Sequence, residues 1–179
     1  MQTLRHLKSF LKRKEVKEFV VIVAIAALIT GGFWLSLVAI LPTSNPLAQV
    51  ESGSMEPTLE IGDLVVVRGI NSSQIKVGDI ILFKSPSEPE KLIVHRVIKI
   101  HLINGELYFE TKGDNNSVSD YKFWGWLVPA RNVIGIVIYR IQYVGWIFLF
   151  LHSPIGYVLI IILIITIIYL EFAPGKSEK

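Results

Sequence analysis

The sequence predicts a small, mainly β domain flanked by N-terminal and C-terminal transmembrane helices. Apolar residues make up 51% of the 179 residues and concentrate near both ends of the chain. Between these ends lie short runs rich in Val, Ile, Leu and aromatic residues, and turn-forming residues separate the runs. No helical period of useful length appears in this middle part, so we expect it to be all β.

The first apolar run, residues 19–41, contains no charged residue. It is longer than the roughly 20 residues that cross a bilayer as a helix. Lys and Arg dominate the 18 residues before it, which predicts a cytoplasmic N-terminus and an exit to the outside at residue 42. A cleaved signal peptide is the alternative, but its apolar region is usually about 7–15 residues long, so we favour a retained anchor.

The second apolar run begins at Ser153 and Pro154, which are typical of a helix N-cap and first helical residue. It is rich in Ile and has no polar face, which favours a membrane span over a buried or interfacial helix. An aromatic stretch precedes it at the expected interface. The predicted division is a cytoplasmic basic segment 1–18, a transmembrane helix 19–41, an extracytoplasmic β domain 42–144, an interfacial aromatic segment 145–153, a second transmembrane helix 154–173 and a cytoplasmic tail 174–179.

Five strands are expected in the β domain after a linker at Pro42–Pro46. They are Leu64–Arg68, Asp79–Lys84, Leu92–Ile103, Glu106–Lys112 and Val133–Tyr143.

Asn104-Gly105 between two of these strands is a strong hairpin signal. A two-residue loop fixes the register, and it places Lys99 opposite Glu110, a pair of opposite charges that supports the alignment. Continued along the strands, the same register places His95 opposite Asp114. Directly opposed Cβ atoms lie about 4.5–5.5 Å apart, so the imidazole and the carboxylate could form a hydrogen bond. A β-bulge between them would shift this pairing.

A lone histidine on a strand is usually structural, and the expected carboxylate neighbour is what makes His95 a candidate base. A carboxylate on one ring nitrogen fixes the tautomer and leaves the other nitrogen free to take a proton. Asp114 and Asp120 bracket a polar stretch that also fits an ordinary turn. As a cation-binding loop it lacks the glycine and glutamate of an EF-hand, so no metal site is predicted.

Ser52-Gly53-Ser54 lies shortly after the first apolar run. A serine nucleophile needs a base for its proton and donors for the oxyanion, and a loop serine alone is weak evidence of either. Composition excludes other classes: without cysteine the chain has no disulfide, thiolate metal site or cysteine nucleophile. The net charge is only +3 and the basic residues cluster before the first span, so no nucleic-acid partner is predicted.

Five segments in order resemble signal peptidase I, specifically its archaeal and endoplasmic-reticulum branch. Ser-Gly-Ser-Met-Glu-Pro-Thr-Leu at 52–59 resembles the nucleophile box of that family. The other four are Ile-Gly-Asp-Leu-Val at 61–65, Val-Gly-Asp-Ile-Ile at 77–81, His-Arg-Val at 95–97, and Thr-Lys-Gly-Asp-Asn-Asn at 111–116 followed by Asp120.

The resemblance implies roles for five residues. Ser54 would be the nucleophile, and His95 the general base at the position where bacterial relatives carry lysine. Asp120 would be the more critical acid and Asp114 a second functional acid, whereas the hairpin register selects Asp114 as the partner of His95. Ser52 would contribute its hydroxyl to the oxyanion hole.

The implied activity is a membrane-bound serine endopeptidase that removes signal peptides from secretory precursors, cleaving after small residues on the outer membrane face. No metal or organic cofactor is needed for this chemistry. Expected partners are signal-peptide precursors and the lipid bilayer, with other membrane subunits or a translocon as further candidates. Phe123, Trp124 and Trp126 are candidates for the lipid interface or for the core.

Two other functions stay open at this point. A self-cleaving repressor-type protease shares a related β fold but uses lysine and carries a DNA-binding domain. A membrane-anchored scaffold or chaperone with a β domain would be no enzyme at all. The short chain with two anchors favours a multi-pass protein of an archaeal cell membrane over the endoplasmic reticulum.

Overall fold

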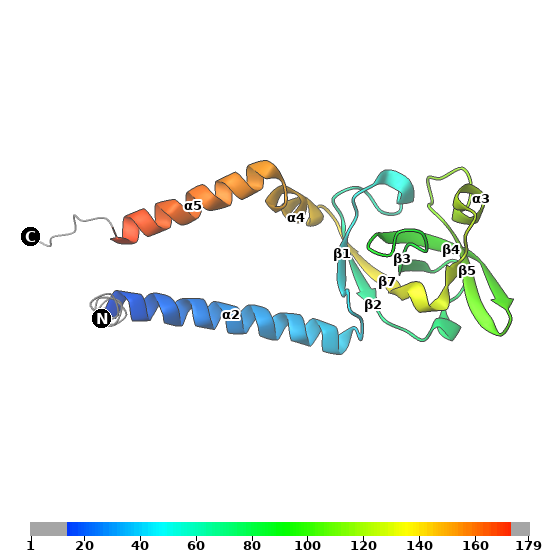
Figure 1. Cartoon of the computed structure of the whole chain (residues 1–179), viewed down its shortest axis with the longest axis horizontal. Coiled ribbons are helices and arrows are strands. Elements are labelled where there is room, and N and C mark those ends of the chain that lie inside the picture. The colour runs from blue at the N-terminus through cyan, green and yellow to red at the C-terminus, as the bar shows by residue number, and fades with distance from the viewer. Residues whose placement is uncertain (1–13, 173–179) are drawn as a thin grey trace, which may run out of the picture. The chain divides into compact units, whose positions relative to one another are not determined.

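The computed structural model (Figure 1) describes residues 14–172, and the chain divides into two compact units between Pro42 and Thr43. The first unit contains the helix α2 (Lys14–Ile40). The second contains the strands β1 (Leu47–Gln49), β2 (Leu64–Arg68), β3 (Ile80–Lys84), β4 (Leu92–Ile103), β5 (Glu106–Lys112), β6 (Val128–Pro129) and β7 (Val133–Ile141), and the helices α3 (Asp120–Trp124), α4 (Gly145–Leu151) and α5 (Pro154–Phe172). Three short 3₁₀ helices complete it: η1 (Gly53–Met55), η2 (Ser72–Gln74) and η3 (Ala130–Asn132).

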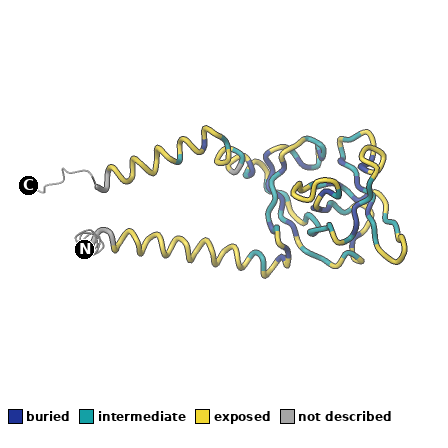
Figure 2. The backbone as a smooth tube through the Cα atoms, in the orientation of Figure 1, coloured by how far each residue is buried: buried dark blue, intermediate teal, exposed yellow. Residues whose placement is uncertain are grey.

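Helix α2 is apolar and exposed along almost its whole length (Figure 2). Residues 17–40 are long and apolar enough to cross a membrane. The hydroxyls of Thr30 and Ser36 donate to the carbonyls of Ala26 and Gly32 in the preceding turn. These two hydroxyls are therefore satisfied without water, as a lipid environment requires.

The predicted second span, 154–173, corresponds to helix α5, which meets α4 at a bend of 75°. As one broken segment they are long and apolar enough to cross a membrane. The Ser153 hydroxyl accepts a hydrogen bond from the Gly156 N–H, which confirms the predicted helix start. The predicted interfacial segment 145–153 is mostly the helix α4. Most of the basic N-terminal segment, residue 173 and the tail 174–179 lie outside the described residues.

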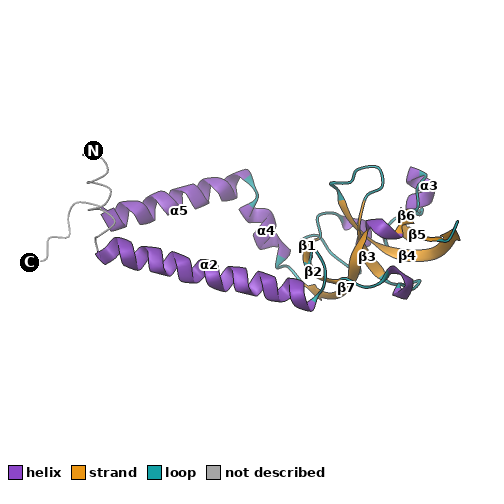
Figure 3. Ribbon diagram, turned by 60° about the horizontal axis from the view of Figure 1, so that its bottom comes forward, coloured by secondary structure: helices purple, strands orange, loops and turns teal. Residues whose placement is uncertain are grey.

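The strands form one antiparallel sheet in the order β1-β2-β7-β3-β4-β5-β6 (Figure 3). Three of the five predicted strands have the predicted bounds, and the other two are shorter by one or two residues, so a mainly antiparallel β domain is confirmed. Strands β1 and β6 and helix α3 were not predicted. Each has only two to five residues, too few to show a period of alternating or helical hydrophobicity.

The hairpin between β4 and β5 turns at Asn104 and Gly105, both with positive φ as a two-residue turn requires. The predicted pairing of Lys99 with Glu110 is present. Between Val97 and Lys99 the register shifts, because Ile98 is an extra residue on β4. Beyond this bulge every partner is displaced by one position, so the predicted alignment of His95 with Asp114 is wrong.

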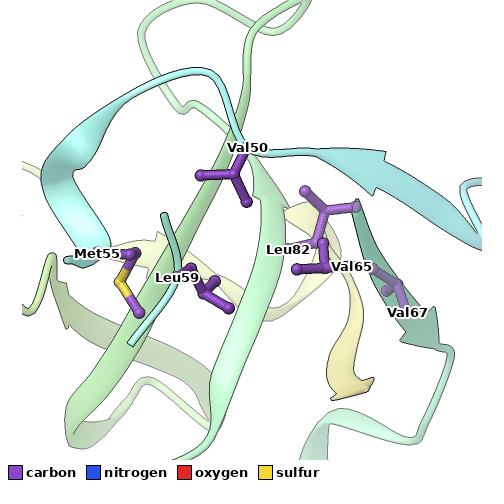
Figure 4. Close-up of a cluster of buried hydrophobic side chains, with 6 residues drawn as sticks. All are labelled: Val50, Met55, Leu59, Val65, Val67 and Leu82. Carbon is purple, nitrogen blue, oxygen red and sulfur yellow. The ribbon is translucent and has the colours of Figure 1, made fainter. Parts of the chain in front are cut away.

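Two clusters of buried side chains support the two halves of the sheet. One lies beneath the loop that follows β1 (Figure 4) and contains Val50, Met55, Leu59, Val65, Val67 and Leu82. The other lies under β3, β4 and β5 and contains Ile75, Ile81, Phe83, Val97, Phe109 and Val128. Each cluster holds a different part of the site described next.

Candidate active site

Ser54 lies in η1, in a loop that the first core cluster holds in place. The neighbouring Met55 is 1% exposed and Leu59 is 2% exposed, so the loop has an apolar anchor on each side of its turn. Farther along, the buried Asp63 accepts the Glu60 N–H at 2.7 Å and forms an ion pair with Arg140 of β7. These contacts fix both ends of the loop that carries Ser54.

His95 lies on β4, and its ring forms an edge-to-face contact with the ring of Phe83 in the second core cluster. Its Nε2 is 3.1 Å from Ser54 Oγ, and its Nδ1 is 2.6 Å from Asp120 Oδ2. The imidazole is therefore held between a hydroxyl and a carboxylate, both within hydrogen-bonding distance. Because His95 and Asp120 are both buried, water competes little for these contacts.

Asp120 is the first residue of α3, and two side chains of β5 fix it there. The Thr111 hydroxyl donates to Asp120 Oδ2 at 2.6 Å. Ser119, the N-cap of α3, donates to Glu110 at 2.7 Å, and this hydrogen bond, aided by the contact with His101, holds the pKa of Glu110 below its usual value. Sequence reasoning missed these supports, because a threonine nine residues from an aspartate carries no signal that the two are in contact.

Asp114 contacts Arg96, the residue after His95. The guanidinium donates from Nε to Asp114 Oδ1 at 2.8 Å and from Nη2 to Oδ2 at 2.6 Å, and from Nη1 to the Gly78 carbonyl. The hydrogen bonds from Arg96, and then from Thr58, hold the pKa of Asp114 below its usual value. The structure thus brings Asp120, and not Asp114, onto the His95 ring, while Asp114 connects the loop after β5 to β4.

We expect Asp114→Asn to destabilise the protein at neutral pH and to have little effect in acid. The lowered pKa of Asp114 means that its carboxylate stabilises the fold above its unfolded pKa, near 4, and that this contribution is lost as the pH falls through the lower folded pKa. A charged hydrogen-bonded pair contributes about 1.5–3 kcal/mol. Thermal unfolding of the full chain in detergent should show a lower midpoint for the variant at pH 7, and the gap should narrow at pH 3. An equal gap at both pH values would contradict this role.

Ser52 lies on the exposed side of the site, with its Oγ 3.3 Å from Ser54 Oγ. Ser52, Ser54, His95 and Asp120 all line one groove of about 940 Å³. The first residues of β4, Leu92–His95, form one wall. These residues pair with β3 on one side, and pairing with β5 begins only at Arg96. The wall therefore offers a strand edge that is open among the described residues.

The aromatic residues of α3 lie beside this groove. Phe123 and Trp124 line it with 67% and 54% of their surfaces exposed. Trp126, which the sequence grouped with them, packs against Phe83 in the second core cluster instead. Only the first two are thus placed to contact lipid or a bound peptide.

The chain of contacts from Ser54 through His95 to Asp120 is suited to nucleophilic attack. The Asp120 carboxylate can hold the proton on Nδ1, which leaves the Nε2 lone pair directed at the Ser54 hydroxyl. Transfer of the hydroxyl proton to Nε2 would make Ser54 a strong nucleophile. Within residues 14–172, no group of three or more acidic, histidine or cysteine side chains is placed to hold a metal ion.

Comparison with known proteins gives consistent matches. A family model described as "Signal peptidase, peptidase S26" matches residues 13–110, a range that includes Ser54 and His95 and ends before both acids. The chain is 35% identical over 155 residues to the signal peptidase complex catalytic subunit SEC11C of Homo sapiens, covering 82% of this chain and 78% of that protein. It is 32% identical over 128 residues to the signal peptidase complex catalytic subunit SEC11 of Yarrowia lipolytica, covering 68% and 73%.

Proposed function

The chain belongs to the signal peptidase family, peptidase S26, and on that premise we propose that Ser54, His95 and Asp120 are the residues with which it removes signal peptides from precursor proteins. The observation that carries the proposal is the continuous chain of contacts, 3.1 Å from Ser54 Oγ to His95 Nε2 and 2.6 Å from His95 Nδ1 to Asp120 Oδ2. Ser54 is the nucleophile and His95 is the general base. Asp120 is the acid that orients the His95 ring and stabilises its positive charge after it takes the proton.

The proposed reaction proceeds by acyl transfer. Ser54 Oγ bonds to the scissile carbonyl carbon as its proton passes to His95 Nε2, and the imidazolium is stabilised by Asp120. The resulting oxyanion accepts hydrogen bonds from the Ser54 N–H and the Ser52 hydroxyl. His95 then gives its proton to the leaving amine, which frees the mature protein. A water molecule then gives a proton to His95 Nε2 as its oxygen bonds to the acyl carbon. The bond from that carbon to Ser54 Oγ breaks, the proton passes from His95 to Oγ, and the signal peptide leaves with a free carboxyl group.

The groove supports an extended substrate. A peptide that lies along the open edge of Leu92–His95 would gain main-chain hydrogen bonds without requirement for a particular sequence. Specificity would then depend on the side chains that point toward the floor of the groove. Small residues at the first and third positions before the cut would fit a floor that the buried core closes from below.

We place the β domain outside the membrane, with α2 as an anchor and the α4–α5 pair as a second, bent span. The exposed apolar surface of these helices supports this arrangement, as do Lys14 and Lys17 at the start of α2. Two expectations rest on the sequence alone and stay predictions: that residues 154–173 form the second crossing, and that the membrane is that of an archaeal cell. The relatives are named as catalytic subunits of a signal peptidase complex, so we propose that other membrane subunits join this chain as well.

The non-enzymatic alternative, a scaffold or chaperone, gives no reason for a buried histidine to lie between a serine hydroxyl and an aspartate. A repressor-type protease would need a lysine base. Within the described residues, the base position beside Ser54 is occupied by His95.

The test is cleavage of a precursor with an intact signal peptide by the full chain in phospholipid vesicles, with the new N-terminus identified by mass spectrometry. We expect wild type to cut after a small residue and Asp120→Asn to lower kcat by about 10⁴-fold, because the imidazolium loses its negative partner. Intact precursor with wild-type protein would favour the scaffold.

Asp114→Asn is the matched control in the same assay, since it makes the same chemical change six residues away. Its contact with Arg96 supports the loop and does not touch the His95 ring, so kcat of the folded variant should stay close to wild type. A harmless Asp120→Asn together with an inactive Asp114→Asn would reverse the two assignments.

A further inference from the structure

We propose that Asn115 is a positioning residue that sets the orientation of the Ser54 N–H toward the reacting carbonyl oxygen. It would act through the peptide group that joins Gly53 to Ser54, without contacting the substrate itself. The inference rests on the proposed function, because it assigns a further residue to the same acyl-transfer site.

Asn115 holds two consecutive carbonyl groups of the nucleophile loop. Its side-chain Nδ2 donates to the Gly53 carbonyl at 3.1 Å, and its backbone N–H donates to the Ser54 carbonyl at 2.9 Å. Within the loop, the Glu56 N–H also donates to the Gly53 carbonyl, at 3.2 Å. The Gly53 oxygen is therefore held by one local donor and by one from a segment 62 residues away.

A peptide group is planar, with its C=O and N–H pointing in opposite directions. A donor that fixes the Gly53 oxygen therefore also fixes the direction of the Ser54 N–H. The same hydrogen bond polarises the amide and makes its N–H a stronger donor. Because the oxyanion forms on the carbon bonded to Ser54 Oγ, the N–H of that same serine is within reach of it, and small errors in its direction weaken the bond.

The two loops approach closely at this crossing. A Cβ on Gly113 would lie 2.5 Å from the Ser54 carbonyl oxygen, so a larger residue would push the loops apart. The residue without a side chain lets the segment after β5 come near enough for both Asn115 bonds to form. Since this segment also leads to Asp120, one connection sets the acid and the nucleophile loop relative to each other.

Two substitutions separate positioning from simple support. Asn115→Ala removes only the side-chain bond, because the backbone N–H still donates to the Ser54 carbonyl. Asn115→Asp keeps the size and shape but directs a carboxylate oxygen at the Gly53 carbonyl. Asn132→Ala is the matched control: Asn132 Nδ2, at the end of η3, donates to the Lys84 carbonyl at the end of β3 at 3.0 Å, which is also an exposed bond from an asparagine side chain to a backbone carbonyl.

The experiment measures kcat and KM of the full chain in phospholipid vesicles, per folded molecule, with a precursor that carries an intact signal peptide. Loss of one neutral hydrogen bond corresponds to a factor of about ten, so Asn115→Ala should lower kcat about tenfold with KM nearly unchanged. Asn115→Asp should lower kcat further, although it is the closer match in shape. Asn132→Ala should match wild type in both constants, and all variants should melt near the wild-type temperature.

The inference is overturned if Asn115→Ala keeps the wild-type kcat, if its only effect is a higher KM, or if Asn115→Asp is more active than Asn115→Ala. The last result would mean that shape rather than the donated hydrogen bond matters. Failure of the proposed function is distinct, because wild type itself would then leave the precursor intact.

Discussion

Replacing Ser54 by alanine should nearly abolish precursor cleavage. Within residues 14–172, no other hydroxyl lies within hydrogen-bonding distance of His95 Nε2, so the base would have no nucleophile to activate. Removing the nucleophile of a serine–histidine–aspartate protease costs about 10⁶-fold in kcat. The measurement is single-turnover cleavage of the precursor by the variant in excess, which detects rates far below those visible at steady state.

Ser52→Ala tests whether the correct serine has been assigned. Its hydroxyl lies only 3.3 Å from Ser54 Oγ, but the contact with the His95 ring is made by Ser54. We expect Ser52→Ala to lower kcat by about 10²–10³-fold, the usual effect of losing one oxyanion donor, and to leave measurable cleavage. Ser73→Ala, on an exposed 3₁₀ turn, should have no effect. An active Ser54→Ala beside an inactive Ser52→Ala would exchange the two roles.

Replacing His95 by alanine should cost about as much as losing Ser54. The two residues act as a unit, because a serine without its base is a poor nucleophile and a base without the serine has nothing to deprotonate. The Ser54→Ala/His95→Ala double variant should therefore be no slower than either single variant. If the two losses multiplied instead, the residues would act in separate steps, and the proposed proton transfer between them would be wrong.

His95→Lys is the sharper substitution. The resemblance to signal peptidase I implies that bacterial relatives carry a lysine base at this position. We expect no substantial recovery relative to His95→Ala. A lysine can act as a base only when neutral, and the Asp120 carboxylate at this site would favour its charged form. Cleavage near the wild-type rate would show that the two bases are interchangeable here.

The sequence predicted the β domain well where structure is local. The register of the hairpin could be predicted from the Asn104-Gly105 turn and from the opposite charges of Lys99 and Glu110. The structure has this register from the turn to Lys99. The predicted register failed at Ile98, the residue next to Lys99, because an extra residue in a strand leaves the alternation of polar and apolar residues too short to read. One displaced position was enough to exchange the apparent partner of His95.

The active site shows the same difference between what the sequence reveals and what only the fold reveals. Ser54, His95 and Asp120 could be named from their order along the chain, through resemblance to a family. Their supports could not, because they depend on contacts between distant segments: Thr111 with Asp120, Arg140 with Asp63, and Asn115 with Gly53. Such pairs involve common residue types with no signal of contact in the sequence, and only the folded chain brings them together.

The contact between Asn115 and the nucleophile loop closes 62 residues of chain, and that between His95 and Ser54 closes 41. Closing long segments is slow relative to forming a hairpin, because the entropy of the chain must be lost before the contact stabilises anything. A newly synthesised molecule would thus have its histidine strand before it has a working serine. The proteolytic site is therefore complete only after contacts across 41 and 62 residues of chain have formed, and we expect a newly synthesised copy to have no activity before then.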